Sequence, residues 1–118
     1  MLRFKQNNNH SGYVALDNSD DTVELSCVSL DSTLLGSDVN FIKMDIEGSE
    51  IEALQGAKYL IKKNKPVLAI CLYHKPDDLW EIPILINRIY NGYDMYLRVH
   101  GDMCLETVLY CIPNNKSN

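Results

Sequence analysis

Acidic and imidazole side chains follow two apolar segments of the sequence, and these residue types suit the removal of a proton from a hydroxyl group. Asp45 and Glu47 come at the end of the apolar run over residues 41–46, and His74 follows the apolar run over residues 67–73. A carboxylate close to an imidazole favours the protonated ring and orients it, as general-base catalysis requires. Asp45, Glu47 and His74 are therefore the candidate catalytic residues.

Simpler interpretations exist for several of these charged side chains. Glu50 and Glu52 lie where a helix is expected to begin, and carboxylates in a first turn complement the helix dipole. His74, taken alone, could simply cap a loop and have no chemical role. A metal site made of Asp45, Glu47 and His74 is conceivable, but their spacing has no diagnostic ligand pattern, so the sequence predicts no metal site.

Missing motifs exclude several enzyme classes. The sequence contains no G-x-S-x-G elbow, no P-loop and no G-x-G-x-x-G. Each of those motifs forms a specific functional group, either an activated serine or a loop of backbone N–H groups around a phosphate. A serine hydrolase of the usual kind and a nucleotide-phosphate site are therefore not expected.

Composition and charge limit the compartment and the partners. The chain has 118 residues, 46% of them hydrophobic and 23% charged, which suits one domain, and its net charge of −5 leaves no basic surface for nucleic acid. No apolar run is long enough to cross a membrane, and the first ten residues lack the apolar region of a secretory signal. The four cysteines show no C-x-x-C spacing, which favours reduced residues and a cytoplasmic location.

The apolar pattern predicts how the first half of the chain is arranged. Residues 1–21 are polar and are expected to form a loop or a disordered lead-in, followed by one domain over residues 22–118. We expect a strand over residues 23–29, a helical turn ending at Gly36, and a buried strand over residues 40–46. Gly48 then allows a tight turn, and Ser49 with Glu52 forms a capping box that opens one helix running to Pro66.

The second half repeats the strand-then-helix order and then changes. Residues 67–73 form a second buried strand, residues 77–82 one helical turn, and a helix begins near Pro83 because proline suits a first turn. Residues 93–99 alternate as a strand, and residues 106–112 return antiparallel to a neighbour. The predicted fold class is α/β, with parallel central strands, a carboxyl-terminal antiparallel strand and helices packed on the sheet.

Five segments in this order resemble one known family. They are FIKMDIEGSE (41–50), LQGA (54–57), YHKPDDLWEIP (73–83), YLR (96–98) and ETVLY (106–110). Together they resemble the carboxyl-terminal half of the FkbM family of S-adenosylmethionine-dependent methyltransferases, over about Val23 to Pro113. The resemblance implies a Rossmann-like methyltransferase sheet and methyl transfer from S-adenosylmethionine to a hydroxyl of a sugar, glycan or natural-product acceptor. Asp45 matches the acidic position at the end of the fourth strand, beside the transferred methyl group.

The sequence departs from that family before residue 22. Family members hold the donor with their first two strands and a glycine-rich loop, and none of these precedes residue 22. The expected fold is therefore a truncated methyltransferase sheet without its donor-binding half, and no cofactor-binding residue is identified. Two functions stay open: an incomplete O-methyltransferase, or a non-catalytic α/β module that acts in protein–protein association.

Truncation also predicts an exposed sheet edge. Without the first strand of the family, the strand over residues 40–46 would expose unpaired backbone groups, and such an edge can pair with another chain. We expect either self-association through this edge or a local repair in which residues 23–28 fold over it.

Overall fold

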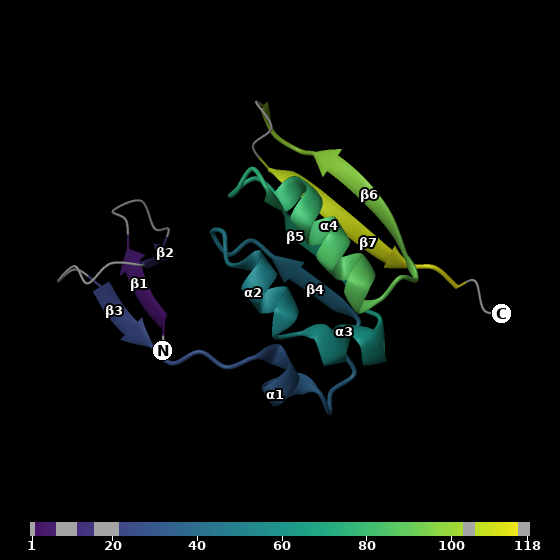
Figure 1. Ribbon diagram of the computed structural model, residues 1–118, viewed down its shortest axis with the longest axis horizontal. Coiled ribbons are helices and arrows are strands. Elements are labelled where there is room, and N and C mark those ends of the chain that lie inside the picture. Colours follow the sequence, from purple (N-terminus) through teal and green to yellow (C-terminus); the bar gives the residue numbers. More distant parts are fainter. Residues whose placement is uncertain (1, 7–11, 16–21, 103–105, 116–118) are drawn as a thin grey trace.

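The strands among the described residues form two separate sheets. The computed structural model describes residues 2–6, 12–15, 22–102 and 106–115 (Figure 1). The smaller sheet has the strand order β2-β1-β3 and the larger one the order β4-β5-β7-β6. In chain order the elements are β1 (Leu2–Gln6), β2 (Gly12–Ala15), β3 (Thr22–Leu25), α1 (Leu30–Leu34), β4 (Phe41–Met44), α2 (Glu50–Gln55), α3 (Lys58–Asn64), β5 (Val67–Cys71), α4 (Asp78–Ile89), β6 (Tyr93–Val99) and β7 (Thr107–Pro113).

The larger sheet confirms the predicted α/β class. β4 and β5 are parallel neighbours in the register Ile42↔Leu68, and β7 runs antiparallel to both β5 and β6. β7 lies between β5 and β6, although it follows both in the chain. The apolar runs of β4 and β5 favour their pairing, because parallel strands covered by helices carry few polar residues, although β4 is the end strand of the sheet.

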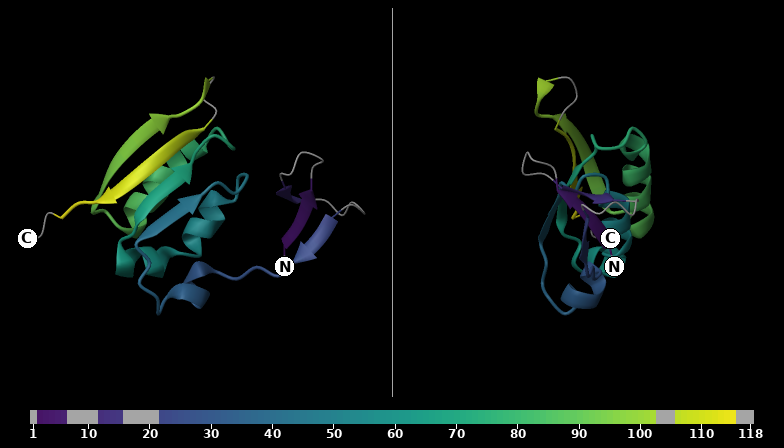
Figure 2. Two further views of the ribbon diagram at one scale, coloured as in Figure 1. Left: turned by 180° about the vertical axis from the view of Figure 1, so that it is seen from behind. Right: turned by 90° about the vertical axis from the view of Figure 1, so that its left-hand side faces the viewer.

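The helices cover one face of the larger sheet and enclose the core there. Figure 2 shows α2, α3 and α4 on the same side of the four strands. Leu54, Leu60, Ile61, Ile82 and Ile86 from these helices are fully buried against Leu68 and Ile70 of β5. Burying such side chains contributes about 1.5–3 kcal/mol each, which is enough to hold the short helices on the sheet.

The expected single helix from Ser49 to Pro66 is wrong. The chain forms α2 and α3 with a break at Gly56 and Ala57, and the side chain of Ser49 makes no capping hydrogen bond. Asp31 of α1 explains the break, because its two carboxylate oxygens accept hydrogen bonds from the backbone N–H groups of Tyr59 (3.1 Å) and Leu60 (2.8 Å). A helix therefore starts anew at the point where a residue distant in the sequence caps it.

The predicted division of the next helix at Pro83 is also wrong. α4 is continuous from Asp78 to Ile89, with Pro83 inside it. Proline removes one helical hydrogen bond. Ile82 and Ile86 on either side of it are both fully buried, so packing of this face on the sheet holds the two turns in line.

The amino-terminal prediction of loop or disorder is wrong where the structure describes it. Leu2–Gln6 and Gly12–Ala15 are strands that pair antiparallel, and the remaining residues of the 1–21 segment lie outside the described part. The strand predicted over residues 23–29 ends at Leu25 and pairs with β1. One edge of β3 is thus paired within the small sheet, and the alternative in which residues 23–28 cover the β4 edge does not occur.

The outer edge of β4 has no partner strand among the residues that the structure describes. β4 is the end strand of its sheet, and the carbonyl of Asn40 accepts from Val67 N–H of β5 at 3.0 Å. Bonding groups alternate along a parallel strand, so the backbone groups of Phe41 and Lys43 point to the open edge. The side chain of Phe41 is 55% exposed there.

The chain is therefore expected to self-associate as its concentration rises, because an open apolar edge can pair with a second copy. Light scattering over a dilution series measures this, and Phe41→Lys is expected to lower the apparent mass by placing charge on the edge. Ile84→Lys, at an equally exposed position on α4, is the matched control. A monomer at every concentration would contradict the prediction.

Candidate functional site

The ends of β4 and β5 bring the three predicted catalytic residues together. Asp45 directly follows β4, while His74 lies three residues beyond the end of β5. Because the two strands are parallel neighbours, their carboxyl ends meet at one edge of the sheet, which we call the acidic rim (Asp45, Glu47, Glu50 and His74). The sequence-based expectation that Asp45, Glu47 and His74 lie side by side is met.

A strained turn presents Glu47 at this rim. Glu47 has a φ of 57° and Gly48 a φ of 97°, both in the left-handed region that favours glycine. A Cβ on Gly48 would lie 3.1 Å from Cε of the flexible Lys75 side chain, so the backbone conformation is the main reason for glycine there. Left-handed backbone at a residue other than glycine is costly and occurs often at functional sites.

His74 lies between three carboxylates. Its Nε2 is 3.3 Å from Oδ1 of Asp45 and 3.6 Å from Oε2 of Glu47, and its Nδ1 is 3.2 Å from Oε1 of Glu50. Its side chain is only 9% exposed. Neither ring nitrogen is aligned for a hydrogen bond within the described chain, although both lie close to carboxylate oxygens. The ring is thus nearly buried among three carboxylates at the rim.

Glu50 is the rim residue that sequence reasoning missed. It was assigned to the helix dipole with Glu52, but its side chain is fully buried and its Oε1 accepts a hydrogen bond from Ile46 N–H at 2.9 Å. That bond fixes the carboxylate beside Nδ1 of His74. The local pattern offered no signal, since Glu50 and Glu52 are equivalent in a first turn until α4 covers one side of it.

Tyr73 holds Asp45 from the other side. Its hydroxyl donates to Oδ1 of Asp45 at 2.8 Å, and its ring lies against His74 with the ring centroids 4.1 Å apart. Burial, followed by the hydrogen bond to Asp45, raises the pKa of Tyr73. The phenol therefore stays protonated at neutral pH and acts as a donor to the carboxylate.

A second buried carboxyl group lies behind the rim. Asp78 begins α4 and is 1% exposed, and burial followed by the nearby charge of Glu50 raises its pKa. Oδ2 of Asp78 and Oε2 of Glu50 have no hydrogen-bond partner in the described chain. Two carboxyl groups, those of Glu50 and Asp78, therefore lie buried behind the rim, and the raised pKa of Asp78 favours its neutral form.

The remaining candidates lie elsewhere. His100 directly follows β6, which β7 separates from β5, and its Nε2 lies 2.8 Å from the hydroxyl oxygen of Tyr110. Cys71 and Cys111 are buried free thiols, as expected for packing residues, and burial raises their pKa values to about 11 and about 12. Cys27 is free and exposed, and Cys104 lies outside the described residues.

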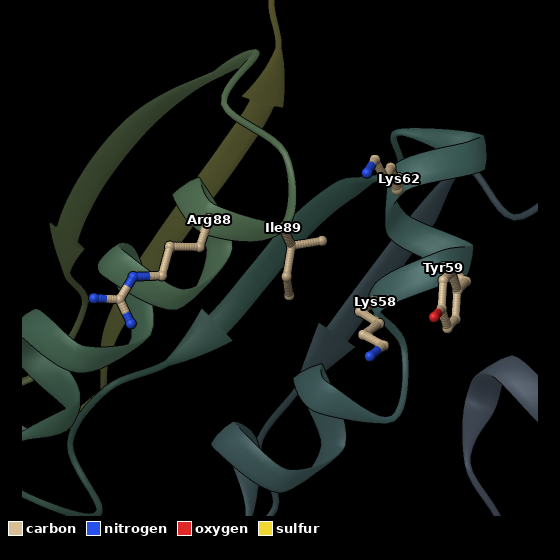
Figure 3. A pocket seen from close by; sticks show the side chains of 5 residues that line it. All are labelled: Lys58, Tyr59, Lys62, Arg88 and Ile89. Atoms are coloured by element: carbon tan, nitrogen blue, oxygen red, sulfur yellow. The ribbon is translucent and has the colours of Figure 1, made fainter.

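An open pocket between α3 and α4 contains none of the rim residues. Figure 3 shows its lining, which is Lys58, Tyr59, Lys62, Arg88 and Ile89. Arg88 and Ile89 are at the carboxyl-terminal end of α4, whereas the rim adjoins the beginning of that helix. The pocket and the rim are therefore at opposite ends of α4.

Comparison with known proteins finds one matching family and one similar crystal structure. A family model described as the methyltransferase FkbM domain matches residues 1–104. The crystal structure of the methyltransferase FkbM from Methylobacillus flagellatus is similar at 43% identity with a TM-score of 0.62, covering 64% of this chain and 20% of that one. The chain thus spans about a fifth of the length of that relative, and no curated protein matches it.

Among the described residues, no helix is long and apolar enough to cross a membrane.

Proposed function

The chain belongs to the methyltransferase FkbM domain family, and on that premise we propose that it forms the acceptor side of an O-methyltransferase. In this proposal a methyl group passes from S-adenosylmethionine to a hydroxyl of a sugar, glycan or natural product. Asp45, Glu47 and His74 are the catalytic residues, and the reaction takes place in the cytoplasm. The polar rim, open on one side, suits a small hydroxylated acceptor better than a nucleic acid.

One observation carries the proposal, namely the convergence of His74 with Asp45 and Glu47 at the carboxyl ends of β4 and β5. A hydroxyl oxygen that takes up a methyl group must lose its proton. An imidazole flanked by carboxylates accepts such a proton well, because the carboxylates stabilise the imidazolium that forms. Glu50 supports this role by facing Nδ1, which leaves Nε2 turned toward the acceptor side.

The rim residues do not fit the whole methyl donor. A nucleotide-like group needs a glycine-rich turn that it can approach closely. The turn at the rim contains one glycine, Gly48, and is not glycine-rich. We therefore expect the donor to be held by a region other than the described residues. In this proposal, residues 22–118 are the carboxyl-terminal portion of a methyltransferase domain, without its donor-binding half.

The isolated chain is accordingly expected to bind S-adenosylmethionine weakly or not at all. Calorimetric titration measures this directly. A dissociation constant of about 1 μM, which corresponds to about −8 kcal/mol, would contradict the expectation and would place a donor pocket within this chain.

The methyl-transfer proposal is tested with a chimera in which this chain replaces the matching fifth of the Methylobacillus flagellatus methyltransferase. The assay uses a labelled methyl donor and an acceptor hydroxyl that the unmodified relative methylates. Labelled product is the expected result. A folded chimera that binds the donor and labels no acceptor would overturn the proposal.

The unpaired edge of β4 favours a second candidate function, in which the chain binds a partner strand and catalyses nothing. The two functions depend on different residues. Phe41→Lys would then abolish partner binding, whereas His74→Ala would leave it unchanged.

A further inference from the structure

We propose that Asp45, Glu47 and Nε2 of His74 bind a divalent metal ion. One ligand atom from each of these residues lies within 4.8 Å of the other two. The sequence alone predicted no metal site because the spacing of the three residues follows no known pattern. The proposal concerns the binding of an ion to this chain and requires neither donor nor acceptor.

The buried imidazole is the observation that distinguishes this rim from an ordinary acidic surface. His74 is 9% exposed, and its ring nitrogens have no hydrogen-bond partner within the described chain. Burying a polar group without a partner costs free energy, so such a group points to a ligand or an ion. Nε2 faces the space between Asp45 and Glu47, at 3.3 Å and 3.6 Å from their oxygens.

Glu50 arranges His74 as a metal ligand. Its Oε1 lies 3.2 Å from Nδ1 of the ring and is itself fixed by Ile46 N–H. A carboxylate at this position would accept the proton of Nδ1 once an ion holds the ring, and would leave the lone pair of Nε2 for the cation. Metal-binding histidines are commonly held in this way, with the second nitrogen donating to a carboxylate or a carbonyl.

The two carboxylates are also held or placed for an ion. Tyr73 donates to Oδ1 of Asp45 at 2.8 Å, so a lone pair on that carboxylate stays available. Glu47 is presented by its left-handed backbone, and its side chain is 44% exposed, so it can turn toward an ion. A cation would offset the charge of these two carboxylates, which lie beside the buried carboxyl group of Glu50.

The ligand set limits the kind of ion. Imidazole nitrogen suits Fe²⁺ or Zn²⁺ better than Ca²⁺, whereas the two carboxylates suit Mn²⁺. Ligands at about 2.1 Å from one ion lie at most about 4.2 Å apart, so the exposed carboxylates must close by a fraction of an ångström. Rotation of the side chains of Asp45 and Glu47, which are 42% and 44% exposed, is sufficient.

A bound ion would deepen the proposed function, and this consequence rests on it. An acceptor hydroxyl on the ion would have a lowered pKa and would lose its proton to a water molecule at the open side of the rim. His74 would then act as a metal ligand in place of a proton acceptor. Binding of the ion can be measured whether or not methyl transfer occurs.

The test is a titration of the full chain with Mn²⁺ alone, followed by the electron paramagnetic resonance signal of the free ion. We expect one bound Mn²⁺ per chain. Asp45→Asn and His74→Ala are expected to weaken binding at least about 10-fold, and Glu50→Gln by about 10- to 100-fold through the orientation of His74. Glu52→Gln, which removes an exposed carboxylate from the same helical turn, is the matched control and should leave binding unchanged.

Two results would overturn the proposal. One is a folded chain that binds no Mn²⁺ at millimolar concentration, and the other is binding that Asp45→Asn leaves unchanged. Circular dichroism shows whether each variant is folded. If His74→Ala unfolds, Mn²⁺ binding by Asp45→Asn tests the proposal, because the side chain of Asp45 is exposed and its replacement should not disturb the fold. Broadening of the amide signal of Gly48 by Mn²⁺ provides a second readout of where the ion binds.

Discussion

Replacing His74 by alanine in an enzyme completed by a donor-binding region is expected to lower the methylation rate by about 10²- to 10⁴-fold, the usual cost of losing a general base. The reason is the position of Nε2, 3.3 Å from Asp45 and 3.6 Å from Glu47 at the open rim. Asp45→Asn should act in the same direction. The measurement is the rate of label transfer at saturating donor, with Glu52→Gln as the control.

Stability separates this catalytic effect from simple unfolding. The side chain of Asp45 is 42% exposed, and asparagine can still accept the hydrogen bond from Tyr73, so Asp45→Asn should change the free energy of unfolding by less than about 0.5 kcal/mol. Methylation rates that stay unchanged in both His74→Ala and Asp45→Asn would remove these residues from the catalytic assignment.

The largest expected effect on stability comes from Ile70→Ala. Ile70 is fully buried in β5, which lies between β4 and β7, and it packs in the core under the helices. Removing its side chain leaves a cavity and should lower the free energy of unfolding by about 2–5 kcal/mol. This is a large share of the about 5–15 kcal/mol that stabilises an ordinary domain.

Urea denaturation measures this loss. Leu79→Ala is the matched control, since Leu79 on α4 is 49% exposed and its truncation should cost little. Equal losses in the two variants would mean that the helices do not pack on β5 as described. The self-association expected from the β4 edge makes a low protein concentration necessary for the experiment.

The sequence by itself determined the central elements and the meeting of the predicted site residues. The segments that form β4 and β5 are mostly apolar and are separated by helical segments, so parallel pairing was the favoured arrangement. Asp45 and His74 each follow one of these strands. Their proximity needed no further information, because the carboxyl ends of parallel neighbours lie at one edge of the sheet.

Only the tertiary structure decided the surroundings of that site. The sequence of the first turn of α2 does not distinguish Glu50 from Glu52, and packing against α4 buries the first while the second stays exposed. Likewise Asp31 caps α3 by accepting a hydrogen bond from the N–H of Leu60, 29 residues away in the sequence. This cap separates α3 from α2, where local propensity alone would continue one helix. Local patterns report which face of an element is apolar, whereas the partner that a polar side chain meets is set by chain segments far away in the sequence. The buried carboxylate beside Nδ1 of His74 is therefore a product of the fold, even though the imidazole and the rim could be predicted from the sequence.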